Sequence, residues 1–148
     1  MTEPPGSDHI LEIARQLIDA LNQGDQERFK SFLDPDAVWN SAATGEIENG
    51  PDDIARSLFS FRGTFPDLHE EVANAFASAD HAALETVATG TYDGAVIPTI
   101  PGSGRHVNLQ LCYIFRIHNG KIIKLTTYMD YRTLMVQLDM IMAPATGP

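Results

Sequence analysis

The fold is decided by one stretch near the C-terminus: residues 119–130 read NGKIIKLTTYMD, and YRTLMVQL follows at 131–138. Its Asn-Gly pair lies between two alternating apolar runs. This is the strongest short-range signal for a β-hairpin, because both turn residues accept positive φ angles. The stretch therefore predicts a turn, a strand and a short amphipathic helix that begins after Asp130. The Asp130 carboxylate either takes part in chemistry or starts this helix.

The composition is that of one soluble, acidic domain. With 148 residues, 43% of them hydrophobic and 20% charged, the chain can bury a core as a single domain. We assign residues 1–148 to that domain, with frayed tails at 1–7 and 143–148. Twenty acidic residues against ten basic ones give a formal charge of −10. This is the wrong sign for attraction to nucleic acid or to an anionic membrane, so we expect neither as a partner.

The sequence also disfavours several classes of site. Cys112 is the only cysteine, which excludes an internal disulfide and a cysteine-rich zinc site. The five histidines are scattered without metal-ligand spacing, and no glycine-rich phosphate loop follows a strand. We therefore expect no metal and no cofactor. Because no signal peptide and no long apolar run is visible, the expected location is the cytoplasm.

The order of periodic segments predicts an α+β fold. Apolar residues have helical spacing in the first third of the chain and strand-like alternation from residue 68 onward. We expect helices near 8–23, 26–33 and 51–62, a strand at 36–41, strands at about 68–78, 81–92, 105–118 and 121–129, and a last helix at 131–142. This order places the helices on one face of an antiparallel sheet. The connection at 93–104 is rich in Gly and Pro, and we expect it to form a rim or lid.

Alternation at 105–118 separates two faces of one strand. The apolar face, which must meet the helices, carries Val107, Leu109, Leu111, Tyr113, Phe115 and Ile117. The opposite face is mixed in character. We expect it to face solvent or a second copy of the chain, which predicts a homodimer.

An ordered set of short motifs resembles one known family. The motifs are LNQGD at 21–25, DAVWN at 36–40, GP at 50–51, FPDL at 65–68, TGTYDG at 89–94, GR at 104–105, FRIHNGKI at 115–122, and Asp130 with QL at 137–138. Together they resemble the SnoaL-like polyketide cyclases of the nuclear-transport-factor-2-like superfamily, over nearly the whole chain. The resemblance implies a cone-shaped α+β fold: a strongly curved antiparallel sheet, three N-terminal helices, a short C-terminal helix and a deep apolar pocket. Because relatives of this fold include enzymes and plain binding domains, the fold alone does not decide function.

The resemblance implies a chemistry, from which this sequence departs at one position. The cyclases close a ring by an intramolecular aldol reaction that one carboxylate runs as acid and base, without metal or cofactor. The slot of that aspartate, three residues before Asp130, holds Thr127, whose hydroxyl cannot abstract a proton near neutral pH. The family's polar partners on the preceding strand fall at Leu111 and Tyr113, of which only Tyr113 keeps a hydrogen-bonding group.

Asp130 and Tyr113 are the catalytic candidates. Asp130 would act as a base if it reached the pocket, which its strand parity opposes. As a helix N-cap it would instead accept backbone N–H groups. Tyr113 would donate a hydrogen bond to a substrate carbonyl or enolate, or would be a core tyrosine satisfied by the backbone. Asp93, at the mouth of the pocket, is the other nearby base.

The candidate ligand contacts are expected to line the same pocket as Tyr113. They are Trp39, Asn40, Tyr92, Leu109, Leu111, Thr127 and Met129. We therefore predict a SnoaL-like cyclase or isomerase that acts on a hydrophobic, polyketide-like or polycyclic small molecule. Epoxide hydrolysis is disfavoured, because the arginine and aspartate that it needs fall near Thr86 and Ala88. Two alternatives stay open: a non-catalytic domain that binds a hydrophobic ligand in this pocket, and a dimerisation domain whose pocket is filled by side chains.

Overall fold

A computed structural model describes residues 7–93 and 103–142 of the chain. Its elements are α1 (Ser7–Gln23), α2 (Gln26–Ser31), β1 (Leu33–Ser41), β2 (Ile47–Asn49), α3 (Pro51–Thr64), β3 (His69–Ser78), β4 (His81–Thr91), β5 (His106–His118), β6 (Lys121–Met129) and α4 (Tyr131–Gln137). None of the helices in the described ranges is long and apolar enough to cross a membrane.

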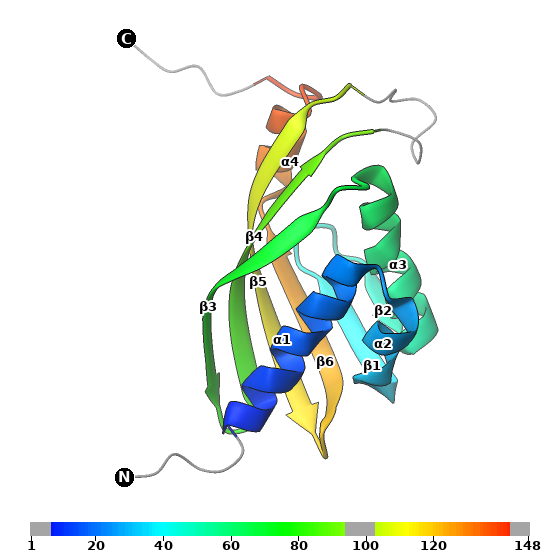
Figure 1. Cartoon of the computed structure of the whole chain (residues 1–148), viewed down its shortest axis with the longest axis vertical. Helices are drawn as coiled ribbons and strands as arrows, with labels where there is room; N and C mark the ends of the chain where they lie inside the picture. The colour runs from blue at the N-terminus through cyan, green and yellow to red at the C-terminus, as the bar shows by residue number, and fades with distance from the viewer. Residues whose placement is uncertain (1–6, 94–102, 143–148) are drawn as a thin grey trace.

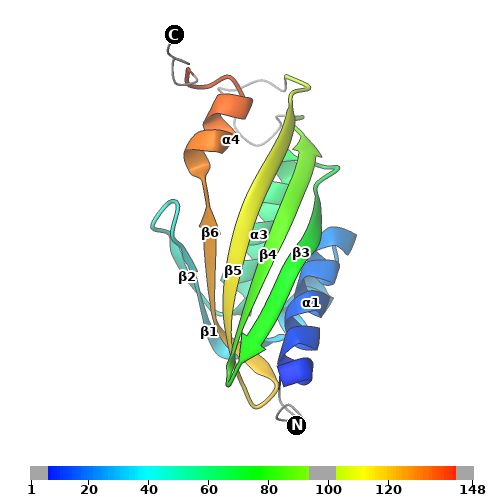
Figure 2. The ribbon, with the colours of Figure 1, turned by 90° about the vertical axis from the view of Figure 1, so that its left-hand side faces the viewer.

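The strands form one curved sheet with the helices α1, α2 and α3 on one face (Figure 1). The strand order is β2-β1-β6-β5-β4-β3. All neighbours are antiparallel except β1 and β6, which run parallel. Figure 2 looks onto the opposite face, where no described helix covers β3 to β6, and α4 lies at one end of the sheet. The predicted α+β fold, with three N-terminal helices and a short C-terminal helix, is confirmed.

Local sequence signals explain most of these elements. Asn119 and Gly120 take φ angles of 51° and 75°, so the turn between β5 and β6 uses the positive φ that the Asn-Gly pair predicts. The carboxylate of Asp25 accepts the backbone N–H of Arg28 and caps α2. Pro51 begins α3, where its missing N–H costs no helical hydrogen bond.

Apolar periodicity places the core between the helices and the inner face of the sheet. The buried residues of α1 are Ile10, Ile13, Ala14, Leu17, Ile18, Ala20 and Leu21, and the six apolar residues predicted for the inner face of β5 are all buried. The buried stripe of α1 packs on the inner face of the sheet, mainly against β3. This packing fixes which residues of β3 can point inward.

The largest differences from the sequence prediction concern β1, β2 and the last helix; α2 and α3 end within two residues of the expected positions. The strand expected at 36–41 begins at Leu33, because a register shift between Leu33 and Val38 accommodates Pro35 within the pairing with β6. The three-residue strand β2 was not predicted, since so short a segment has no readable alternation. The last helix ends at Gln137 instead of 142, and Asp139, with φ 60°, turns the chain away. The predicted lid lies largely, and the predicted tails almost wholly, outside the described residues, although Ser7 begins α1.

Candidate functional site

A cavity of ≈ 440 Å³ lies between the inner face of the sheet and the helices α3 and α4. Most of its lining is apolar. The apolar side chains from the helices and the adjoining loops include Phe61, Phe65, Leu68, Leu134, Met135 and Leu138. Two carboxylates, Glu46 and Glu70, line it, and Glu46 is exposed while Glu70 is buried. No Lys, Arg or His from residues 7–93 or 103–142 is among the lining residues. The cavity is therefore apolar, with one buried acidic group.

Glu70 forms the centre of a buried hydrogen-bonded cluster drawn from three strands. It lies on β3, and its residue surface is 5% exposed. The Tyr113 hydroxyl on β5 donates to both carboxylate oxygens, over 2.7 Å to Oε1 and 2.8 Å to Oε2. The Thr86 hydroxyl on β4 donates to Oε2 over 3.2 Å. Alternation along each strand turns all three side chains toward the helices, so the cluster follows from the register of the sheet.

The cluster contains two titratable groups, Glu70 and Tyr113, and the pKa of each is raised. Burial raises the pKa of Glu70, and the hydrogen bonds from Tyr113 and Thr86 offset only part of this effect. Burial and the nearby Glu70 charge raise the pKa of Tyr113 well above its ordinary value. None of the ion pairs of the described residues involves Glu70. Glu70 is thus the more acidic of the two groups, while Tyr113 keeps its proton.

The backbone of Glu70 is held by the end of α1. The Asn22 side chain donates to the Glu70 carbonyl over 2.7 Å and accepts the Glu70 N–H over 2.8 Å. Because β3 is the edge strand, these two backbone groups have no strand partner on that side. Arg62 of α3 adds bonds of 3.0 Å and 3.1 Å to the carbonyls of Leu21 and Leu68. α1, α3 and the start of β3 are therefore tied together where Glu70 enters the cavity.

A second polar pair lies on the opposite side of Tyr113 from the Glu70 strand. The indole Nε1–H of Trp39 on β1 donates to Oγ1 of Thr127 on β6 over 2.8 Å. Both residues line the cavity and are buried, with 7% and 8% of their surfaces exposed. Thr127 lies directly opposite Tyr113 in the pairing of β5 with β6.

The structure brings together most of the residues predicted to contact a ligand. Those that line the cavity are Trp39, Tyr92, Leu111, Tyr113, Thr127 and Met129. Leu109 points inward but is packed in the core at 1% exposure, beyond the cavity lining. Asn40 is outside the lining as well, because it follows Trp39 on β1 and so points to the other side of the strand. The open cavity does not fit the alternative in which Trp39 and Tyr113 fill the pocket.

Asp130 is placed at the start of α4, outside the cavity lining. Its exposed carboxylate accepts the backbone N–H of Thr133 over 3.1 Å and the Thr133 hydroxyl over 2.6 Å. These bonds lower the pKa of Asp130. This geometry is that of a helix N-cap, and the carboxylate borders a shallow groove on the outer side of the sheet, beside Cys112 and Tyr128. Asp93 is exposed and is likewise not among the cavity lining.

Glu70 is the site residue that sequence reasoning missed. The segment LHEEV at 68–72 contains two adjacent acids, which suggests a solvated strand. A signal was nevertheless present, because Leu68, Glu70 and Val72 share one face in a two-residue period. In the structure Leu68 and Glu70 are buried and Val72 is half-buried, whereas Glu71 is exposed.

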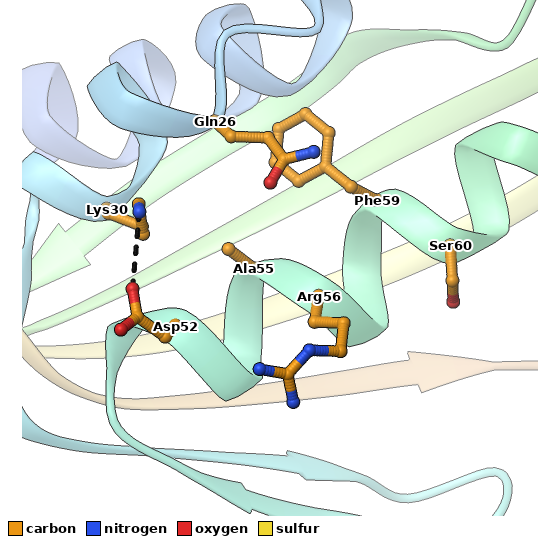
Figure 3. Close-up of a pocket in the computed structure, with 7 residues that line it drawn as sticks. All are labelled: Gln26, Lys30, Asp52, Ala55, Arg56, Phe59 and Ser60. Atoms are coloured by element: carbon orange, nitrogen blue, oxygen red, sulfur yellow. Dashed lines mark hydrogen bonds and ion pairs between the residues drawn. The ribbon is translucent and has the colours of Figure 1, made fainter.

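A second hollow, between α2 and α3, offers no comparable chemistry (Figure 3). Its lysine, Lys30, contacts Asp52 at 3.2 Å and Glu27 at 2.7 Å. Its arginine, Arg56, lies 2.9 Å from Asp53. The charges that border this hollow are already paired at the surface. Throughout residues 7–93 and 103–142, no group of three or more His, Cys, Asp or Glu side chains is placed to hold a metal ion.

Comparisons with known proteins agree with this fold. The family model described as SnoaL-like polyketide cyclase matches residues 11–138. A proposed SnoaL-like polyketide cyclase from Jannaschia sp. CCS1 superposes with a TM-score of 0.85 at 19% identity, over 98% of this chain and 99% of that chain. AclR, a proposed hydroxylase from Streptomyces galilaeus, gives 0.81 at 23% identity, over 93% and 89%.

IdmH, a proposed polyketide cyclase from Streptomyces antibioticus, gives a TM-score of 0.78 at 24% identity, over 88% of this chain and 98% of that chain. At these identities the structural likeness establishes the fold and not the reaction. A comparison with curated protein sequences gave no match.

Proposed function

The chain belongs to the SnoaL-like polyketide cyclase family, and we propose that it catalyses proton transfer on an uncharged, polyketide-like or polycyclic ketone without a cofactor. In this proposal Glu70 is the acid–base group. The outcome is a ring closure by an intramolecular aldol step or the isomerisation of a double bond. The reaction takes place in the cavity beneath α3 and α4.

One observation carries the proposal: a buried carboxylate with a raised pKa lines an apolar cavity that contains no described basic side chain. A general base works best when its pKa lies near the working pH, and burial moves a glutamate in that direction. Titratable groups perturbed by burial inside a cavity are enriched at active sites. Glu70 supplies the carboxylate that the family slot at Thr127 lacks.

The proposed step balances without a further reactant. The Glu70 carboxylate removes a proton from the carbon beside a substrate carbonyl, and the C–H electron pair becomes an enolate. For ring closure, the enolate carbon attacks a second carbonyl of the same molecule, and the resulting alkoxide takes the proton back from Glu70. For isomerisation, Glu70 returns the proton to a different carbon. Either route leaves Glu70 ionised for the next turnover.

The role proposed for Tyr113 differs from the sequence prediction. Its hydroxyl proton is directed at Glu70, at 2.7 Å and 2.8 Å from the two carboxylate oxygens. A tyrosine has a single O–H to donate, so in this state the proton is not available to a substrate carbonyl. We therefore propose that Tyr113 positions the Glu70 carboxylate and lowers the cost of its charge, together with Thr86.

The same bonds also support a second candidate function, a domain that binds a hydrophobic ligand without turnover. Both Glu70 oxygens already accept hydrogen bonds from Tyr113 or Thr86. A fully satisfied buried carboxylate can be a structural element that fixes the sheet. Turnover by the wild-type chain separates this candidate from the enzyme.

The test is deuterium incorporation into hydrophobic ketones in D₂O, followed by NMR with β-tetralone as the first probe. We expect exchange above the uncatalysed background, and a loss of roughly 10²–10⁴-fold in Glu70→Gln. The matched control is Glu71→Gln, which makes the same change on an exposed neighbour of β3 and should exchange like wild type. Unchanged exchange in Glu70→Gln would overturn the acid–base assignment. Binding of the ketones without any exchange would favour the binding domain.

We also propose that the chain forms a homodimer through the outer face of the sheet. That face exposes 49% of Tyr128 and leaves Cys112 and Ile114 half-buried. Apolar side chains on a sheet face that no described helix covers are typical of a surface that meets a partner. Light scattering coupled to size exclusion should give twice the chain mass, and Tyr128→Glu should shift it toward the monomer. A monomeric wild type would contradict this proposal.

A further inference from the structure

We propose that the Thr127 hydroxyl is a hydrogen-bond donor for the oxygen of the ligand, with its direction set by Trp39. The inference deepens the proposed function, on which it rests, because it adds a second polar contact to the same cavity. Glu70 would take the proton, and Thr127 would hold the carbonyl oxygen on which negative charge develops. The ligand class is thereby narrowed to molecules that present an acceptor oxygen to β6.

The donor and the acceptor in the hydrogen bond between Trp39 and Thr127 follow from the groups involved. An indole N–H can only donate, so Thr127 Oγ1 is the acceptor in the 2.8 Å bond from Trp39 Nε1. The Thr127 hydroxyl must then use its own proton elsewhere. Among the hydrogen bonds of residues 7–93 and 103–142, none takes that proton. A buried hydroxyl that lines a cavity and has already accepted one bond is prepared to donate into the cavity.

The position of Thr127 suits an anchor for the reacting carbonyl. Thr127 pairs directly with Tyr113 across β5 and β6, and side chains at such directly opposed positions are neighbours on one face of the sheet. The Tyr113 hydroxyl in turn contacts Glu70. The order across the sheet is therefore donor, tyrosine, carboxylate. The proposal therefore requires that the carbon beside a carbonyl held at Thr127 lie within reach of the Glu70 carboxylate, along the side chain of Tyr113.

This arrangement gives the family slot a different role. Where the resemblance places an acid–base aspartate, this chain has a residue that cannot act as a base but can stabilise an enolate oxygen. The carboxylate lies instead on β3, at the far edge of the sheet. The two tasks of a proton-transfer site, base and oxyanion donor, are thus assigned to separate strands.

The test compares two probes that differ only in the acceptor oxygen: β-tetralone and its hydrocarbon tetralin, each titrated by calorimetry. Thr127→Val keeps the shape of the side chain and removes the hydroxyl. We expect it to weaken β-tetralone binding about three- to tenfold, the effect of one lost neutral hydrogen bond, and to leave tetralin binding unchanged. Thr127→Ser restores the hydroxyl and should restore β-tetralone affinity.

A second variant protects the test against a folding defect. Thr127→Val alone leaves the buried Trp39 N–H without its acceptor, which can destabilise the chain. The double variant Trp39→Phe/Thr127→Val removes both partners and should show the same selective loss for β-tetralone. An equal loss for β-tetralone and tetralin, or no loss for either, would overturn the inference.

The experiments distinguish a failure of the proposed enzyme activity from a failure of the proposed Thr127 donor. If the wild-type chain exchanges no ketone but Thr127→Val selectively loses β-tetralone affinity, the donor is supported and the enzyme is not. If exchange depends on Glu70 while Thr127→Val keeps wild-type β-tetralone affinity and exchange rate, the enzyme is supported and the donor is overturned. The infrared carbonyl stretch of bound β-tetralone provides a direct readout, because a hydrogen bond from Thr127 lowers its frequency. That shift should disappear in Thr127→Val.

Discussion

Glu70 in the cavity and Asp130 at the end of β6 are both carboxylates that accept hydrogen bonds from hydroxyl groups, yet their pKa values move in opposite directions. Glu70 accepts from Tyr113 and Thr86 and its pKa is raised, because burial outweighs those bonds. Asp130 accepts from the hydroxyl and N–H of Thr133, remains exposed, and its pKa is lowered. The difference teaches that burial, more than the presence of hydrogen-bond donors, decides the direction in which the pKa of a carboxylate moves.

The largest expected effect is on turnover, where the two carboxylates should behave oppositely. Glu70→Gln should reduce ketone proton exchange by roughly 10²–10⁴-fold, since it removes the acid–base group. Asp130→Asn should keep exchange close to the wild-type rate, because the residue lies outside the cavity lining. NMR exchange rates on purified variants measure both. A reversed pattern would return the catalytic role to Asp130.

The next effect, on stability, concerns the two hydrogen bonds by which the Asn22 side chain holds the backbone of Glu70. Asn22→Ala removes both bonds to the Glu70 backbone and should lower the free energy of unfolding by about 1–3 kcal/mol, because edge-strand groups lose their partners. Exchange should fall as well. The control is Gln23→Ala, an exposed neighbour in the same helix turn, which should change stability by less than about 0.5 kcal/mol. Urea titration gives the free energy of unfolding of both variants. Equal losses in Asn22→Ala and Gln23→Ala would show that the bonds from Asn22 to Glu70 have no special role.

The pH dependence of stability should distinguish the two carboxylates by sign. The folded-state pKa of Glu70 is raised above its ordinary 4.5, so its contribution to stability is present below that value. The contribution is lost as pH rises through the folded pKa. The free energy of unfolding of wild type minus that of Glu70→Gln should therefore fall with rising pH above 4.5, by at most about 1.4 kcal/mol per pH unit. A flat difference across neutral and acidic pH would mean that Glu70 does not titrate there.

The smallest effect is expected for the exposed carboxylate. The folded-state pKa of Asp130 is lowered below its ordinary 3.8, so its contribution is present above that value and is lost as pH falls through the folded pKa. Asp130→Asn should therefore lower the melting temperature slightly at neutral pH and converge with wild type in strong acid. Thermal unfolding followed by circular dichroism measures this. A lower melting temperature that persists in strong acid would point to lost packing instead of a lost charge.

The features that could be predicted from the sequence are those that depend on a local pattern. The Asn119-Gly120 turn, the buried stripe of α1 and the alternation of β5 are each set by residues within a few positions of one another. Together these local patterns are sufficient to predict the α+β class. Strand parity also gave the inward positions on β5 and β6, of which Leu111, Tyr113, Thr127 and Met129 line the cavity.

The features that the sequence did not predict depend on contacts between segments distant in the chain. Alternation at 68–72 turns Glu70 inward, but its partners come from distant segments: Asn22, 48 positions away, binds its backbone, and Tyr113, 43 positions away, binds its carboxylate. The adjacent Glu71 made the segment resemble a solvated strand. Asn40 was predicted as a contact from the resemblance, although its parity on β1 opposes that of Trp39. Asp130 directly follows the hairpin strand β6, and its carboxylate caps the N-terminus of α4.

Trp39 is the only tryptophan of the chain, and it lines the cavity with its indole N–H bonded to Thr127. Its fluorescence therefore comes from a single known site, without contributions from elsewhere in the molecule. A ligand that enters the cavity will change the polarity around one indole ring and shift or quench its emission. The protein thus carries its own optical probe, by which unlabelled compounds can be screened for binding before any product is known.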